Sequence, residues 1–321
     1  MANNLLRLGA RALPESIKAP IRTNIDRFRS NRTLRVSYGH ISILKYHPEA
    51  YGSSSYVISK HQAYDNEGED DGLPVPPRPL WIGYGNNFGV KGKEWFLTKG
   101  KLDVEKMLQI VAASDFTITP GSRVLEMGCA AGRMIRHLKK FAESNEIWGV
   151  DVNASLINWC KCNLSPPFHF ATTTTIPHLP FSDSYFDFIF TGSVFTHIDD
   201  LAEAWLLELR RILSPQGRLY MTIHDRHTIK LLDEGYYYDK TGYFTDKDKK
   251  ETDLTGRLNA DAAYNATKDT FGMLVVGRDF RAQVFYDMDY LRRVAASCMY
   301  DILSVNEEAY GHQTGVLLKK H

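Results

Sequence analysis

The chain has 321 residues, 43% of them hydrophobic, and a formal net charge of +1 at pH 7. This length allows one large domain or two smaller ones with a substantial buried core. A charge so close to neutral gives no reason to expect a nucleic-acid partner, and no apolar run approaches the roughly eighteen residues that span a membrane. We therefore expect a globular protein without a transmembrane segment or a nucleic-acid interface.

The cysteines and the first residues bear on the compartment. The first fifteen residues hold an apolar stretch broken by Arg7 and Arg11, which is too short for a secretory signal. The cysteines form no C-x-x-C pair and no spaced set of metal ligands, so we expect reduced thiols, no metal site and a cytoplasmic protein. They are Cys129, Cys160, Cys162 and Cys298.

The first 79 residues are expected to form an extension and a linker ahead of a folded domain over residues 80–321. Residues 1–35 carry eight basic side chains against two acidic ones, which favours a solvated, partly helical extension. A docking segment for an anionic surface or partner, or an organelle-targeting peptide, are the alternatives. Residues 36–60 have room for a short strand. Residues 64–79 are acidic and then rich in proline, a composition that buries little apolar surface.

Predicted helices and strands then alternate along the chain. Apolar residues at helical spacing predict helices over 102–114, 134–141, 156–164 and 199–213, and apolar runs predict strands over 123–126, 147–150, 186–191 and 218–224. Strands joined by crossover helices predict a parallel sheet with helices on both faces. After a polar and aromatic stretch, a helix is expected over 287–296 and strands over 300–305 and 314–318.

A glycine loop follows the first of these strands. The segment VLEMGCAAGR, residues 124–133, places Gly128 and Gly132 where the chain must bend and let its backbone approach a ligand closely. We expect a side chain at Gly128 to block that approach. Asp151 ends the next strand, where a carboxylate can accept hydrogen bonds from both hydroxyls of a ribose.

Two departures argue against a dinucleotide at this loop. Ala130 replaces the middle glycine of the G-x-G-x-x-G pattern, and Glu126 stands at the end of the strand. A carboxylate there is unfavourable beside phosphate and suits an ammonium or sulfonium ligand. A nicotinamide dehydrogenase is therefore disfavoured.

The arrangement resembles the class I S-adenosylmethionine-dependent methyltransferases, with a domain of the type-11 kind. HLPFSDSYFDFIF (178–190), TGSVFTHID (191–199) and LSPQGRLYM (213–221) continue the likeness. It implies a Rossmann-like α/β fold with a seven-stranded, mostly parallel sheet, a core over 121–225 and an insertion after strand five. LPVPPRPLW, SVFTHI and YGHQTGVLLKK are similar to bacterial methyltransferases encoded alongside glycosyltransferases, which implies acceptors in polysaccharide or glycolipid biosynthesis.

The resemblance also implies a site for S-adenosylmethionine. Glu126 and the backbone of the glycine loop would hold the methionine part, Asp151 the ribose and Val152 the adenine. Many relatives read the adenine amino group with Asp or Asn, where this chain has threonines. The cofactor residues implied are Glu126, Gly128, Ala130, Gly132, Asp151, Val152, Thr172, Thr173, Thr191, Gly192 and Ser193.

Transfer to a sugar hydroxyl benefits from a general base, and the candidates follow the fourth and fifth strands. His197 fits by position, or else is a residue at a helix start that hydrogen-bonds backbone. His224 and Asp225 form a base with an orienting acid only if the strand has already ended between them. Together with His227 they also have the residue types of a metal site, but no fourth ligand is evident.

Residues 227–281 are expected to form a cap over the acceptor, because they follow the fifth strand and are rich in aromatic residues that suit sugar rings. The function expected is methyl transfer from S-adenosylmethionine to a hydroxyl of a sugar or other small molecule. The alternative is a non-catalytic module that keeps the fold in order to bind a partner such as a glycosyltransferase.

Overall fold

The computed structural model describes residues 44–46, 56–58, 66–81, 92–198, 200–234, 254–277 and 282–321. The chain divides into two units, Met1–His61 and Gln62–His321. In the first unit, β1 (Leu44–Tyr46) pairs antiparallel with β2 (Tyr56–Ile58), which confirms a short strand within 36–60. The basic segment 1–35 lies outside the described residues.

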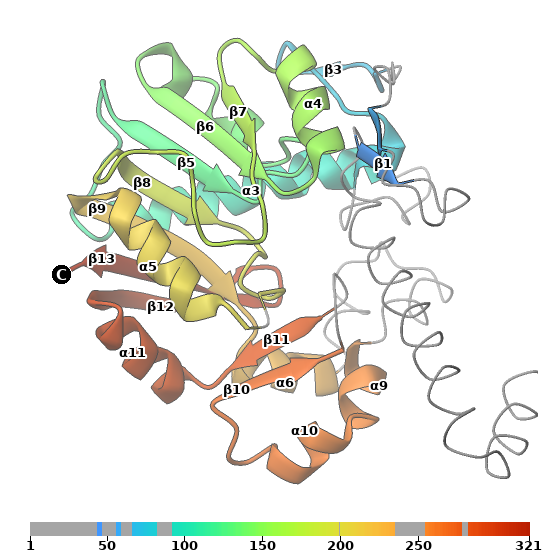
Figure 1. Cartoon of the computed structure of the whole chain (residues 1–321), viewed down its shortest axis with the longest axis vertical. Coiled ribbons are helices and arrows are strands. Elements are labelled where there is room, and N and C mark those ends of the chain that lie inside the picture. The colour runs from blue at the N-terminus through green and yellow to red at the C-terminus, as the bar shows by residue number, and fades with distance from the viewer. Residues whose placement is uncertain are drawn as a thin grey trace, which may run out of the picture. The chain divides into compact units, whose positions relative to one another are not determined.

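A seven-stranded sheet forms the centre of the second unit (Figure 1), in the order β12-β13-β9-β8-β5-β6-β7. Five neighbouring strands are parallel, whereas β13 runs antiparallel to β9 and to β12. The predicted seven-stranded, mostly parallel sheet is therefore confirmed. The strands are β5 (Arg123–Met127), β6 (Glu146–Asp151), β7 (His169–Thr172), β8 (Phe186–Thr191), β9 (Leu213–Ile223), β12 (Tyr300–Tyr310) and β13 (Gln313–Lys320).

Helices cover both faces of this sheet because successive strand residues point to opposite sides. Val124 packs with α3 (Gly92–Ala112) and α4 (Ala154–Asn163) in one apolar cluster. Its neighbour Leu125 packs with α5 (Ala202–Ile212) and α11 (Met288–Ser297) in the other. Among the described helices, none combines the length and apolar character needed to cross a membrane.

The first helix, the segment after the glycine loop and strand β7 differ from the sequence prediction. Helix α3 begins ten residues earlier than expected and runs through Gly100, where a Cβ would lie 2.4 Å from the carbonyl oxygen of Arg133. Glycine is needed at this position because the backbone of α3 lies close to the backbone of Arg133. It does not end the helix. The glycine loop leads into a short 3-10 helix, η5 (Ile135–Leu138), in place of a longer helix. Strand β7 was not predicted because, of its four side chains, only Phe170 is buried.

The expectation that residues 64–79 bury little apolar surface is wrong for the described part of the segment. Residues 66–81 form the hairpin of β3 (Glu69–Asp70) and β4 (Leu73–Pro74), followed by η3 (Arg78–Leu80), and Val75 is fully buried. The buried guanidinium of Arg136 donates hydrogen bonds to the carbonyl oxygens of Asp70, Leu73 and Pro74, at 3.2, 3.0 and 3.1 Å. One cation thus fixes three backbone groups, which composition cannot reveal.

The insertion after β9 has a small core of its own. It comprises α6 (Arg226–Asp233), α9 (Leu254–Asn259), α10 (Ala262–Thr267), β10 (Met273–Val276) and β11 (Gln283–Tyr286). Figure 1 shows it in orange around the β10–β11 hairpin. Tyr264 and Phe271 are buried in this core, so they are not free platforms for an acceptor. The tyrosines at 236–238 and 243, which also belong to the expected cap, lie outside the described residues.

Candidate active site at the carboxyl edge of the sheet

The glycine loop leaves β5 through three left-handed residues. Gly128, Ala130 and Gly132 have φ values of +81°, +47° and +76°. Ala130 adopts this conformation against the preference of an L-residue. Its backbone N–H donates to Asp151 Oδ2 at 2.9 Å, while Asp151 Oδ1 accepts from the backbone N–H of Asn153 at 2.7 Å. Asp151 therefore holds the loop as well as standing at the end of β6.

The two glycines are also required because other side chains of the protein lie close to them. A Cβ on Gly128 would lie 2.3 Å from Val194 Cγ2, and one on Gly132 would lie 2.5 Å from Leu164 Cδ1. Both contacts are with side chains of the protein itself. That a side chain at Gly128 would block a ligand stays a prediction; in the described structure such a side chain would meet Val194.

Glu126 is buried behind this loop, with 3% of its surface exposed. Its carboxyl accepts a hydrogen bond from the backbone N–H of Ile135, and Oε2 has no partner among the described residues. Burial raises the pKa of Glu126 to about 8, while the Arg133 cation acts to lower it. At neutral pH the group is therefore mostly protonated unless a further cation lies beside it.

Glu126→Gln is expected to make the protein more stable relative to wild type as pH rises. Between pH 5 and 7.5 the unfolded carboxyl ionises whereas the folded one keeps its proton, so wild-type stability falls with pH. The glutamine lacks this loss, and the difference in free energy of unfolding should grow by up to about 1.4 kcal/mol per pH unit. Urea unfolding of both proteins across this range measures it. Parallel pH profiles would show that Glu126 is already ionised.

The other predicted cofactor residues lie along neighbouring strand ends. Val152 is 42% exposed, and Thr172 is paired in register with Asp151. The backbone N–H of Thr173 donates to the carbonyl of Asp151 at 2.9 Å. Thr191 is fully buried at the end of β8, where Gly192 and Ser193 continue the chain. The predicted residues of β6, β7 and β8 are thus brought to one edge of the sheet.

Sequence reasoning missed three residues of the turn between β12 and β13. Gln313 donates to Ser193 Oγ at 2.8 Å and accepts from Thr222 Oγ1 at 2.7 Å. The ring of Tyr310 lies beside Gly192, where a Cβ would be 3.0 Å from it, and its hydroxyl accepts a hydrogen bond from Arg133. His312 stands between them in the chain. In the sequence, the motif YGHQTG indicated only a resemblance to other methyltransferases. No local pattern shows that it lies beside strands about 120 residues earlier in the chain.

His197 anchors the insertion. Its Nδ1 donates to the carbonyl oxygen of Ala282 at 2.8 Å, which leaves Nε2 with the lone pair in the neutral ring. Desolvation lowers the pKa of His197, and the hydrogen bond to Ala282 acts to raise it. The structure therefore gives His197 the backbone-bonding role considered as its alternative, with Nε2 still able to accept a proton.

The expected pair of His224 and Asp225 does not form. Asp225 caps helix α6: its Oδ1 accepts from the backbone N–H of Thr228 at 2.9 Å, and the Thr228 hydroxyl lies 3.3 Å from the Asp225 backbone N–H. His224 faces His312 instead, with 3.3 Å between the two Nε2 atoms. His227 lies against the acidic residues 307 and 308, so the three residues considered as a metal site point to different partners.

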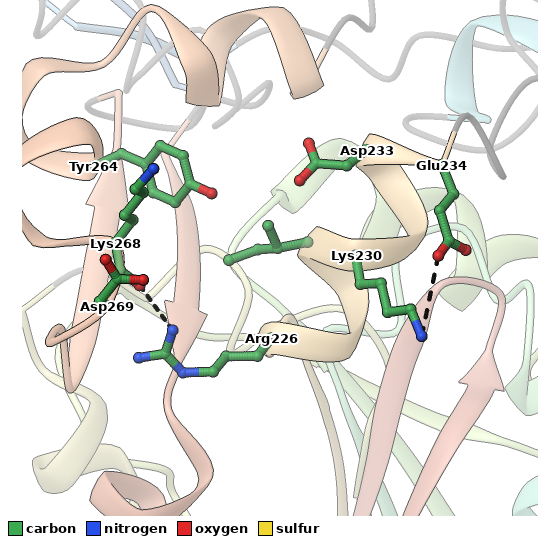
Figure 2. A pocket seen from close by; sticks show the side chains of 8 residues that line it. Arg226, Lys230, Asp233, Glu234, Tyr264, Lys268 and Asp269 are labelled. Carbon is green, nitrogen blue, oxygen red and sulfur yellow. Dashed lines mark hydrogen bonds and ion pairs between the residues drawn. The ribbon is translucent and has the colours of Figure 1, made fainter.

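A pocket of about 400 Å³ lies on the insertion between α6 and α10 (Figure 2). Its lining carries charges of both signs, and two of its cations interact with a backbone carbonyl or a neighbouring carboxylate. Arg226 Nη1 donates to the carbonyl of Lys268 at 2.7 Å, and Lys230 lies 4.0 Å from Glu234. None of its lining residues belongs to the glycine loop or to the ends of β5 to β8. We do not place the reaction there.

Residues 125–221 match the family model for a methyltransferase domain. The chain carries a methyltransferase domain. The likeness to the class I S-adenosylmethionine-dependent methyltransferases is confirmed for this domain by the family match and by its sheet.

Two curated relatives are similar to about a third of this chain. Sterol 24-C-methyltransferase erg6 of Schizosaccharomyces pombe is 33% identical over 105 residues, which are 31% of this chain and 27% of the relative. The ubiquinone/menaquinone biosynthesis C-methyltransferase UbiE of Paraburkholderia phymatum is 32% identical over 108 residues, which are 32% of this chain and 43% of the relative. The matches thus span less than half the length of either relative.

Solved structures are similar at low identity. The PH0226 protein of Pyrococcus horikoshii is 13% identical with a TM-score of 0.48, over 76% of this chain and 99% of that chain. A SAM-dependent methyltransferase of Methanosarcina mazei is 18% identical with a TM-score of 0.45, over 65% of this chain and 96% of that chain.

Proposed function

We propose that this chain transfers the methyl group of S-adenosylmethionine to a hydroxyl of a sugar or other small molecule. The observation that carries the proposal is the bond between Asp151 and the backbone of Ala130, which fixes the glycine loop against a carboxylate at the end of β6 within a methyltransferase domain. This combination suits a ligand with a ribose and a cationic amino-acid part better than a dinucleotide.

Different residues would hold different parts of S-adenosylmethionine. Asp151 would accept from the ribose hydroxyls, and the exposed side chain of Val152 would pack against adenine. The Glu126 carboxyl would face the ammonium group, whose positive charge favours its ionised form. Gly192 and Ser193 would lie at the sulfonium edge. The protein's task is then to align the sulfonium methyl with an acceptor oxygen and to exclude water.

A hydroxyl acceptor is favoured by the uncharged bases near that edge. In an in-line displacement the C–S bond breaks, an O–C bond forms and the hydroxyl proton must leave, so a base is useful. His197 and His224 both have lowered pKa values, chiefly through desolvation, and supply neutral imidazoles. The sugar class rests on the likeness of YGHQTGVLLKK to methyltransferases encoded with glycosyltransferases. We also propose that the protein acts in the cytoplasm and that residues 1–35 can dock to a partner or an anionic surface.

Calorimetry of the full chain with S-adenosylmethionine and with NAD tests the proposal. We expect binding of S-adenosylmethionine and none of NAD. Incubation with donor labelled in the methyl group and a panel of sugars, nucleotide sugars and glycolipids, read by mass spectrometry, then tests transfer. Binding of NAD alone would replace the proposal by a dehydrogenase, and donor binding without transfer to any acceptor would favour the non-catalytic module.

A further inference from the structure

Two histidines meet at the carboxyl edge of the sheet from different elements. His224 follows the last residue of β9, and His312 lies in the turn between β12 and β13. Their ring planes are 22° apart with centroids separated by 5.2 Å, and the two Nε2 atoms lie 3.3 Å apart. Only one proton fits between these two nitrogens, so the rings share a single N–H···N hydrogen bond.

The proton arrangement of His224 follows from its surroundings. Its Nδ1 is buried and has no hydrogen-bond partner among the described residues. A buried N–H without an acceptor is rarer than a buried lone pair without a donor, so Nδ1 carries the lone pair and Nε2–H donates to His312. His224 thus keeps an unused basic nitrogen.

Both rings are neutral near pH 7. Desolvation holds the pKa of His224 well below its usual value, and the neighbouring His312 and His197 act in the same direction. Desolvation, together with Lys99 of α3, lowers the pKa of His312 to about 4. Among the residues that the structure describes, His197 and Lys99 act on the pair, and both disfavour a positive charge on the rings before the reaction.

The pair stands next to the predicted sulfonium edge. His312 lies between Tyr310, which contacts Gly192, and Gln313, which donates to Ser193. His224 is 2% exposed, whereas His312 is half-buried and closer to solvent. A proton taken up at the buried His224 would thus pass to the more exposed His312 before it is released to water.

We propose that Nδ1 of His224 accepts the proton of the acceptor hydroxyl and that His312 takes up the resulting charge through the shared hydrogen bond. This rests on the proposed methyl transfer. As the C–S bond breaks and the O–C bond forms, the hydroxyl proton passes to His224 Nδ1 and the Nε2 proton passes to His312. The sulfonium charge disappears while an imidazolium charge appears, so the net charge of the site is unchanged. His224 is the catalytic residue and His312 a positioning residue.

The proton arrangement is tested without an acceptor. Long-range nitrogen–proton NMR spectra of the ¹⁵N-labelled full chain with bound S-adenosylhomocysteine report the protonated nitrogen of each ring. We expect His224 protonated on Nε2 alone and both rings neutral at pH 6, with His224→Gln and His312→Gln assigning the signals. A proton on Nδ1 of His224, or a cationic ring at pH 7, overturns the proposal.

Turnover tests the division of roles. His224→Gln should lower kcat by about 10²–10⁴-fold. His312→Gln can still accept from His224 but cannot carry the proton, so it should keep the NMR signature and lose about 10–100-fold in kcat. His227→Gln is the matched control and should be unchanged. Because the pKa of His224 lies well below the usual value of 6.5, wild-type kcat should not fall as the pH is lowered from 8 to 6.5. Full activity of His312→Gln overturns the relay. Failure of the proposed function appears instead in the wild-type protein, either as absent donor binding in calorimetry or as absent transfer to every acceptor tested.

Discussion

Asp151→Ala is expected to weaken S-adenosylmethionine binding by about 2–3 kcal/mol, or roughly 30- to 150-fold. The charged carboxylate would accept from both ribose hydroxyls, and hydrogen bonds to charged groups have this magnitude. In the folded chain the same carboxylate accepts from the backbone N–H groups of Ala130 and Asn153. The alanine variant therefore loses a ligand contact and loosens the loop that surrounds it.

Calorimetry with the purified full chain measures this loss, and Asp151→Asn separates its two causes. The asparagine keeps one acceptor oxygen for the loop but removes the charge, so we expect an intermediate affinity with a smaller change in thermal stability. A folded Asp151→Ala variant that binds the donor as tightly as wild type would remove Asp151 from the cofactor site.

Shortening the insertion is expected to abolish methyl transfer while leaving donor affinity within about twofold, since the Asp151 loop lies on separate elements. The insertion is attached at the carboxyl edge of the sheet, where we propose that the acceptor binds. The backbone N–H of Val284 donates to Thr196 O at 2.9 Å, and that of Tyr286 donates to His224 O at 2.8 Å. A segment attached there is well placed to cover an acceptor beside the sulfonium edge.

The structure indicates where such a deletion can begin and end. Leu258 of α9 is fully buried in the insertion's core and must be kept. Thr255 Oγ1 donates to the carbonyl of Leu232 at 3.1 Å, so the chain ends that flank residues 236–252 lie close enough for a short Gly-Ser linker. In the matched control, a Gly-Ser segment of the original length replaces residues 236–252. This variant loses the side chains of the segment but keeps its length. Product formation by the shortened protein, at the wild-type rate on the same acceptor, would refute the cap.

Much of the fold is determined by local sequence. Alternating strands and helices within residues 123–224 predict the parallel sheet, because a buried strand and an amphipathic helix each have their own period. The glycine loop and Asp151 are found by spacing, since both lie at the ends of adjacent strands. The start of α4 is also set locally, because the side chain of Asn153 accepts hydrogen bonds from the backbone N–H groups of Ser155 and Leu156.

The rest depends on contacts between distant residues. Antiparallel pairing of β13 with β9 places Thr314 opposite Ile223, and this register brings His312 to His224 and Gln313 to Ser193. No local pattern encodes a partner 120 residues away. Likewise, Asp225 reads as a possible acid in sequence, but the beginning of α6 one residue later makes it an N-cap, which orients its carboxylate toward backbone N–H groups. The sequence by itself thus determined the alternation of parallel strands with helices and the position of the glycine loop. Only the tertiary structure decided which side chains meet at the carboxyl edge of the sheet, because that depends on strand register and on where a helix begins.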